Sequence, residues 1–235
     1  MEDNNNQMEI NLDSAEIIRQ IRKPYTFRYK VSKEIPQEKV NGIIWDNIRS
    51  IIRERGRLQE TKSEDVAKVV RWICGDYKPM LLLSGGCGNG KTTTAKAVQM
   101  MMQSMYCTSM QDSHGNLHII GNVKQQGSVP QVTFITSNEL RQLAIGSYDD
   151  LCRIQKARFL IIDDIGMEPA STKYYGNELS PIADVLYYRY ENMLFTIATS
   201  NLNREEIGQR YGARIDSRLA EVMDVVNFNS TDFRR

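Results

Sequence analysis

Residues 80–92 read MLLLSGGCGNGKT, an apolar run followed by the pattern GxxxxGKT. The apolar run over 80–84 predicts a buried strand. The stretch from Thr93 to Met105 is rich in Ala and Met and free of Gly and Pro, which predicts a helix. Glycines between a strand and a helix let the backbone wrap closely around an anion. The stretch therefore predicts a phosphate-binding loop at the end of a parallel strand.

The loop also carries the side chains that a nucleoside triphosphate needs. Lys91 is placed to reach the β and γ phosphate oxygens, and Thr92 offers a hydroxyl to Mg²⁺ as the helix begins. A glycine-rich turn without a ligand is the alternative interpretation. The residues expected to contact the nucleotide are Gly85, Gly86, Cys87, Gly88, Asn89, Gly90, Lys91, Thr92 and Thr93.

The composition is that of an ordinary globular protein. The 235 residues leave room for one α/β domain with an appendage. A formal charge of +1 gives no overall attraction to nucleic acid, so such binding would need a local basic face. The four cysteines form no C-x-x-C pair, which argues against a zinc site or a disulfide framework. No long apolar run and no signal-peptide pattern is present, so we expect a cytoplasmic protein that does not contact a membrane.

The first 60 residues are expected to form a helical region that docks a partner. Residues 1–9 are polar and predicted to be disordered. Residues 10–60 are predicted to be helical, and the strongest pattern runs from Gln37 to Arg55 with apolar residues at helical spacing. This apolar stripe either packs on the core or docks a partner protein. The basic and aromatic stretch over 19–33 either meets single-stranded nucleic acid or is an ordinary surface.

A second domain is expected over residues 61–235. Thr61 and Glu64 have the spacing of a capping box, which predicts a helix that ends at Gly75. The polar stretch 111–130 predicts an excursion or hairpin, and its two histidines have no acid or cysteine at ligand spacing. Continuous apolar strands alternating with helices predict a parallel sheet covered on both faces. The further strands are predicted at Gln131–Thr136, Arg158–Asp163, Leu194–Thr199 and Asp224–Phe228.

One predicted strand runs directly into two acids, Asp163 and Asp164. Burying a carboxylate is costly without a cation or hydrogen bonds. Beside a phosphate loop the cation would be Mg²⁺, held by Asp163 through water together with Thr92. Asp164 would then orient and polarise the attacking water. The alternative is a strand that ends in a solvated acidic turn.

Two further stretches fit the same chemistry. Asn201 ends the next predicted strand, and strand carboxyl ends face the ligand crevice in an open parallel sheet, so its amide can bond the water and the γ-phosphate. Arg214 and Arg218 are four residues apart and share one helical face. One of them could be presented to a nucleotide bound by a neighbouring subunit. The alternative is a surface ion-pair pattern with Asp216.

The stretches GGCGNGKT, FLIIDDIG, TSN and RYGARIDSRL, in this order, resemble the AAA+ ATPases of the DnaC/DnaI helicase-loader and IstB transposition-helper group. The resemblance covers about residues 61–235 and is much weaker before them. It implies a P-loop AAA+/ASCE α/β fold with little or no C-terminal lid. It also implies ATP and Mg²⁺ as cofactors, and ATP hydrolysis as the activity.

The resemblance assigns a role to each motif residue. Lys91 and Thr92 are similar to Walker A residues, and Asp163 and Asp164 to Walker B residues. Asn201 resembles sensor 1. The remaining implied residues are Arg218 as the arginine finger with Arg214 beside it, and Arg234 in the sensor-2 role.

The chain departs from the group at Asp164, where many members have Glu. A carboxylate one methylene shorter positions water less well, so we hypothesise slow hydrolysis. The resemblance also implies contact with single-stranded DNA from the segment before Walker B. The candidate residues for that contact are Arg141, Arg153 and Lys173.

Four functions are therefore weighed. The first is an ATP-driven loader that forms a nucleotide-dependent homo-oligomer on single-stranded DNA and delivers a replicative helicase. The second is an IstB-type transposition helper whose partner is a transposase. The third is a nucleotide-gated adaptor with incidental hydrolysis. The fourth is a small-molecule kinase, which has no use for an arginine presented between subunits and explains Asn201 poorly.

Overall fold

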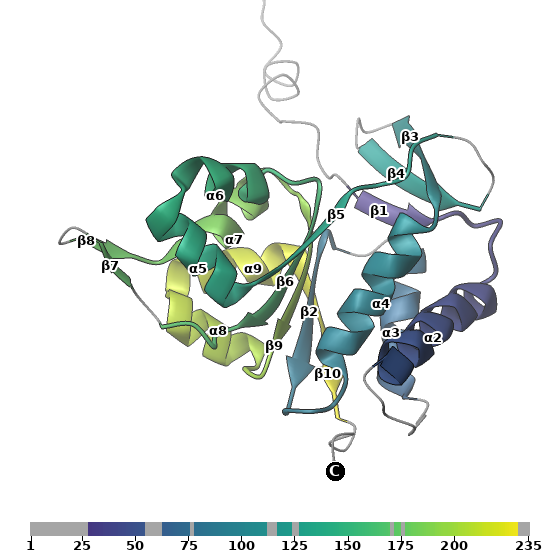
Figure 1. The fold of residues 1–235 in the computed structure, drawn as a ribbon, viewed down its shortest axis with the longest axis horizontal. Helices are drawn as coiled ribbons and strands as arrows, with labels where there is room; N and C mark the ends of the chain where they lie inside the picture. Colours follow the sequence, from purple (N-terminus) through teal and green to yellow (C-terminus); the bar gives the residue numbers. More distant parts are fainter. Residues whose placement is uncertain are drawn as a thin grey trace, which may run out of the picture.

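The computed structural model describes residues 28–54, 63–75, 78–111, 117–123, 127–169, 172–174 and 177–229. A five-stranded parallel sheet with the strand order β10-β2-β9-β6-β5 forms its centre (Figure 1). Each strand begins within one residue of its predicted start. The strands are β2 (Met80–Gly85), β5 (Val132–Thr136), β6 (Phe159–Ile165), β9 (Phe195–Ser200) and β10 (Met223–Phe228).

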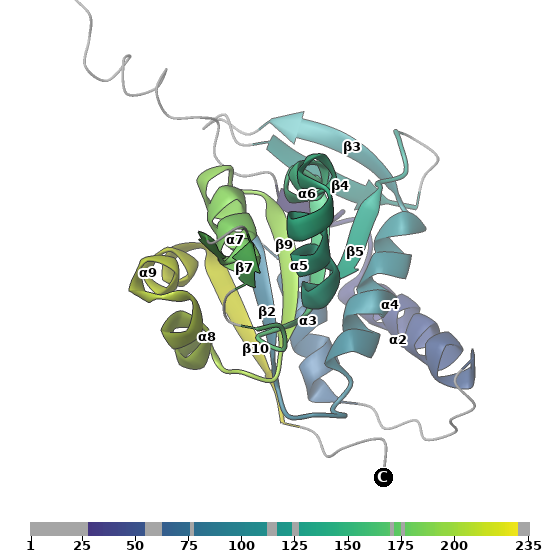
Figure 2. The same ribbon diagram turned by 60° about the vertical axis from the view of Figure 1, so that its left-hand side comes forward.

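Helices cover both faces of this sheet, as Figures 1 and 2 show. One face carries α2 (Gln37–Glu54), α3 (Glu64–Cys74) and α4 (Lys91–Gln103). The other face carries α5 (Ser137–Gly146), α6 (Tyr148–Gln155), α7 (Pro181–Glu191), α8 (Arg204–Tyr211) and α9 (Ala213–Val222). In the sheet, β9 lies between the phosphate-loop strand β2 and the strand β6 that ends in the two acids. The predicted P-loop α/β fold, a parallel sheet with helices on both faces and a glycine-rich loop after β2, is confirmed.

The apolar stripe of α2 packs on the core. Val40, Ile44, Ile48 and Ile51 are at most 7% exposed and belong to the same cluster as the buried side chains of α3 and α4. Of the two interpretations of this stripe, packing is the one that the structure shows. The division of the chain near residue 60 stays a prediction, and the described part of the first region lies against the second.

A three-stranded sheet with the order β1-β4-β3 adjoins the main one. β3 (Tyr106–Gln111) and β4 (Leu117–Asn122) form an antiparallel hairpin, so the hairpin predicted for 111–130 exists but starts earlier. β1 (Arg28–Val31) pairs in parallel with β4, so the helix expected throughout 10–60 is wrong at these residues. The reason is tertiary: Tyr29 is buried and its ring packs edge-on against Phe159 and Phe195.

The remaining local predictions have different outcomes. The N-cap of α3 is Ser63, whose hydroxyl accepts from the Asp65 N–H, whereas the expected cap Thr61 lies outside the described residues. The predicted end of this helix at Gly75 is confirmed. A short antiparallel pair, β7 (Thr172–Tyr174) and β8 (Asn177–Leu179), was not predicted. The disorder predicted for 1–9 also falls outside the described residues.

Arg189 on α7 fixes the edge of the sheet away from the phosphate loop. Its side chain is fully buried and donates to the carbonyls of Gln155, Ala157 and Phe195 and to the Thr196 hydroxyl, at 2.5–2.9 Å. Burial lowers the pKa of this guanidinium to about 9. Four acceptors offset the cost of burying the charge and tie α7 to the starts of β6 and β9.

Candidate nucleotide-binding site

The phosphate loop is closed against the end of β10. Gly85 has φ 148°, and a Cβ there would lie 2.3 Å from the Phe228 carbonyl oxygen. The amide Nδ2 of Asn89 donates to the same carbonyl at 2.7 Å, and Asn89 is 3% exposed. Only glycine fits at position 85, because both the backbone conformation and the space exclude a side chain.

Lys91 lies inside this loop. Its Nζ donates to the carbonyls of Gly85 and Gly86 at 2.7 Å, to Asn89 Oδ1 at 3.1 Å and to Asn201 Oδ1 at 3.0 Å. The side chain is buried, and these uncharged acceptors offset the loss of water around the ammonium. The contact with Asn201 brings together two motifs that lie 110 positions apart in the sequence.

The orientation of Asn201 follows from its partner. A lysine only donates, so the atom that faces it must be the oxygen Oδ1. The amide Nδ2 then lies 3.4 Å from Cys87 Sγ and 3.8 Å from Met167 Sδ. Sulfur is a weak acceptor, so this N–H group can exchange to a phosphate oxygen or a water at little cost.

Asp163, near the end of β6, contacts the start of α4 and the end of β9. Its Oδ1 accepts from Thr92 Oγ1 at 2.9 Å and from Thr199 Oγ1 at 2.6 Å, and the residue is 5% exposed. A hydroxyl and a carboxylate are the hard oxygen ligands that Mg²⁺ takes. These side chains therefore fit a magnesium ion. Within the described ranges no cluster of three or more His, Cys, Asp or Glu side chains is placed to hold a metal.

The second acid is less buried than the first, and the strand is irregular at this position. Asp164 has φ 57°, and the register of β6 with β9 shifts between Ile162 and Ile165. The Asp164 N–H donates to Thr199 Oγ1 at 2.9 Å, and its carbonyl accepts from Ser137 Oγ at 2.8 Å. A bulge re-aims the side chains that follow it, and strained backbone of this kind clusters at functional sites. Asp163 is thereby buried while Asp164 stays half-buried.

Arg214 and Arg218 lie on α9, on the opposite face of the sheet from α4 (Figure 2). Their guanidinium carbons lie 4.8 Å and 4.9 Å from the centre of the Tyr187 ring, and Arg214 also donates to the Tyr187 hydroxyl at 3.1 Å. Arg218 further lies 3.8 Å from a Glu191 carboxylate oxygen. Asp216 instead pairs with Arg204 at 2.7 Å. The structure thus does not bring these arginines to the phosphate loop of their own chain.

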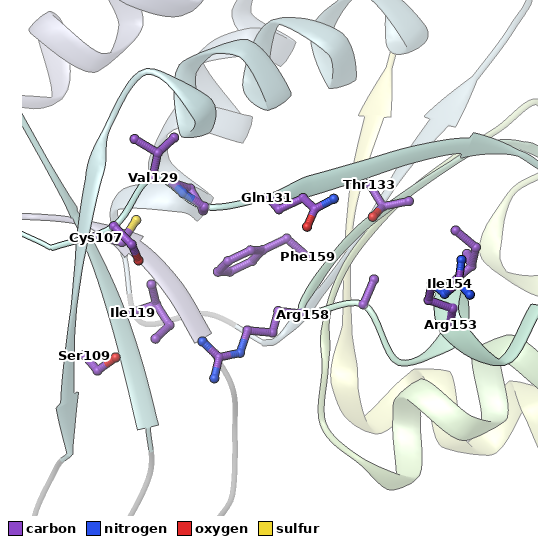
Figure 3. Close-up of a pocket in the computed structure, with 13 residues that line it drawn as sticks. Cys107, Ser109, Ile119, Val129, Gln131, Thr133, Arg153, Ile154, Arg158 and Phe159 are labelled. Atoms are coloured by element: carbon purple, nitrogen blue, oxygen red, sulfur yellow. The ribbon is translucent and has the colours of Figure 1, made fainter. Parts of the chain in front are cut away.

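The residues predicted to contact DNA lie on three different elements. Arg141 lies on α5, and Arg153 lies on α6 with Asp150 at 3.0 Å. Arg153 and Arg158 line a cavity of about 450 Å³ between the small sheet and the starts of β5 and β6 (Figure 3). Lys173 is in β7, and its side chain lies outside the description, as does Arg234 altogether.

Two residues with clear site contacts escape the sequence reasoning. Thr199 bonds both Asp163 and Asp164, yet a threonine before Ser-Asn gives no signal beyond the strand itself. Ser137 holds the Asp164 carbonyl and opens α5. The signal that was available is the capping box of Thr136 and Glu139, which fixes the start of α5 beside the site.

No family model matches the sequence, and no curated protein matches it. Solved structures do match. The structure of DnaI is 17% identical over 85% of this chain and 94% of that chain, with a TM-score of 0.48. The DnaC helicase loader is 17% identical over 79% of this chain and 98% of that chain, with a TM-score of 0.47. AMPPCP-bound DnaA from Aquifex aeolicus is 16% identical over 73% of this chain and 47% of that chain, with a TM-score of 0.45.

The chain is thus similar to proteins of the group that its motifs resemble. At TM-scores below 0.5 these likenesses do not carry a functional assignment, which rests on this chain's own sheet order and site. No helix among the described residues is long and apolar enough to cross a membrane.

Proposed function

We propose that the chain is an ATPase that assembles on single-stranded DNA and loads a replicative helicase. The observation that carries the ATPase part is the convergence of three motif stretches at one sheet edge. Lys91 contacts Asn201, and Thr92 and Thr199 both donate to Asp163. A chain with these groups in contact has the parts that bind a nucleoside triphosphate.

In the proposed reaction each group acts at a stated atom. Lys91 contacts the β and γ phosphate oxygens, and Asn201 Nδ2 donates to the γ-phosphate or the attacking water. Asp164 accepts a hydrogen bond from that water and takes its proton. The water oxygen bonds to the γ phosphorus, the bond from that phosphorus to the bridging oxygen breaks, and ADP and phosphate leave. Thr92 and Asp163 would hold Mg²⁺, which would supply positive charge to the phosphate oxygens.

The arginines complete the site from a second subunit in this proposal. Because α9 lies on the other face of the sheet from α4, Arg218 serves a nucleotide bound by the neighbouring copy. Positive charge there stabilises the transferring phosphoryl group. Hydrolysis is then expected to rise with assembly, which DNA promotes.

The first experiment measures ATP hydrolysis by the full chain with and without single-stranded DNA. We expect Asp164→Asn to retain ATP binding and to lose about 100-fold in turnover, which is the usual size of a general-base contribution. Asp164→Glu is the matched control, because it keeps the carboxylate. Unchanged turnover in Asp164→Asn would remove the base from the mechanism.

The partner is tested by capture on the full chain. We expect ATP-loaded protein to retain the replicative helicase of the source cell, and Lys91→Ala not to retain it. Retention of a transposase instead would move the chain to the transposition-helper function. Biological activity that survives Asp164→Asn would favour the nucleotide-gated adaptor.

A further inference from the structure

Glu168 is a buried acid just after the turn that follows β6. It is 3% exposed, and its Oε2 accepts from the Gly166 N–H at 3.0 Å. Gly166 itself has φ 92°, and a Cβ there would lie 2.6 Å from Leu202 Cδ1. The carboxylate therefore holds a tightly packed turn two residues beyond Asp164.

The other oxygen of Glu168 is held by the end of α8. Its Oε1 accepts from the Tyr211 hydroxyl and lies 3.6 Å from Arg210 Nε. The Arg210 guanidinium also donates to the Glu168 carbonyl oxygen. Burial, together with the carboxylate, raises the pKa of Tyr211 well above its usual range, so its hydroxyl remains a donor. A buried charge held by a cation and two hydrogen bonds fixes geometry strongly, because losing either partner is costly.

The helix that Glu168 contacts is itself fixed to α9. Arg204 on α8 donates to Asp216 Oδ1 on α9 at 2.7 Å. Gly208 approaches so closely that a Cβ there would lie 2.5 Å from the Asp216 carboxylate carbon. These contacts hold the two helices together, and α9 carries Arg214 and Arg218.

We infer that Glu168 is a positioning residue that couples the turn after Asp164 to the α8–α9 pair that presents the arginines. The inference rests on the proposed ATPase function and deepens it. Nucleotide bound at one subunit's site favours one position of the turn, and Glu168 transmits that position to the arginines facing the next subunit. The coupling makes turnover depend on assembly, because the nucleotide at one subunit's site biases the α8–α9 pair, whose arginines act at the next subunit's site.

The test compares Glu168→Gln, Tyr211→Phe and the double variant. The readouts are ATP affinity at low protein concentration, turnover across protein concentrations, and the unfolding midpoint. We expect ATP affinity within about twofold of wild type and assembly-dependent turnover about tenfold lower in each single variant. The double variant should lose no more than either single one, because the two residues act through one contact.

The matched control is Asp224→Asn. Asp224 also accepts a remote backbone N–H, from Lys78 at 3.0 Å, but it lies at the start of β10, at the end of the sheet away from the phosphate loop. Its loss should leave assembly-dependent turnover unchanged.

Each outcome decides between the claims. The coupling would be overturned if the loss of turnover in the double variant equalled the product of the two single losses. It would also be overturned if ATP affinity fell as much as turnover. If turnover rises with assembly in the wild-type chain and rises equally in Glu168→Gln, the coupling is overturned and the proposed function stands. A wild-type chain that does not bind ATP would overturn the proposed function, and the coupling with it.

Discussion

The cationic side chains of the phosphate loop and of α9 have different surroundings. Lys91 is 5% exposed and bonds to backbone and amide oxygens of its own chain. Arg218 keeps 27% of its side chain exposed and rests on the rings of Tyr187 and Tyr190. Cation–ring contacts at exposed positions, such as that of Arg214 with Tyr187, are worth only about 0.5–1 kcal/mol, so Arg214 can exchange this partner at little cost. In the proposed function, this contrast corresponds to nucleotide binding by one chain and hydrolysis that needs two.

A loss of nucleotide binding tests the first half of this contrast. Lys91→Ala removes the cation that the phosphates need, and we expect about 3 kcal/mol of binding free energy to be lost, or about 100-fold in Kd. Titration with a fluorescent ATP analogue measures it. Thr93→Ser, which keeps a hydroxyl in the same loop helix, should bind within about twofold of wild type. Full affinity in Lys91→Ala would show that the nucleotide lies elsewhere.

The second half is tested by Arg218→Ala. We expect unchanged ATP affinity and about 10³-fold lower turnover in the assembly, as for other arginines supplied between subunits. Mixing Arg218→Ala with Asp164→Asn should restore part of the turnover, because one copy keeps the site and the other the arginine. Arg71→Ala, on α3 across the sheet, is the control. No recovery on mixing would argue against a shared site.

A third test measures how much the packing of α2 contributes to the core on the side of the sheet that carries α4. Ile44 is 0% exposed, so Ile44→Ala should lower the free energy of unfolding by about 3 kcal/mol. Ile43→Ala, half-buried on the same helix, should cost clearly less. Denaturant titration gives both values. Equal, small losses of unfolding free energy in the two variants would instead favour a docking role for the apolar stripe of α2.

The smallest effect concerns the order in which the thiols react. Burial raises the pKa of Cys74 and Cys107 to about 11, so their reactive thiolate forms are scarce at pH 8 and their alkylation should quicken only toward pH 11. Cys87 is exposed in the phosphate loop and should react first. Mass spectrometry of partly alkylated protein gives the order, and bound ATP should slow the reaction at Cys87. Protection of Cys107 by ATP instead would contradict the assignment of the loop.

The main sheet was predictable because β2, β6 and β9 are largely apolar runs that each end in a motif. β1 was not, because Arg28–Val31 carries basic residues and becomes a strand only by pairing with β4. In the candidate site, the proximity of Lys91 to Asn201 and of Thr92 to Asp163 was predictable, because each of these residues belongs to a motif. Glu168 was not, because an acid after a strand looks the same in sequence whether it faces solvent or a distant tyrosine.

The closure of the phosphate loop against β10 also makes the end of that strand a place to observe the site. Phe228 accepts from Asn89 in the loop, and the next residue, Asn229, donates its N–H to Asp65 on α3 while remaining exposed. A fluorophore attached at Asn229 would therefore lie one residue after the β10 residue that contacts the loop, without occupying the loop. Its emission would follow occupancy in real time, with no need to label the nucleotide.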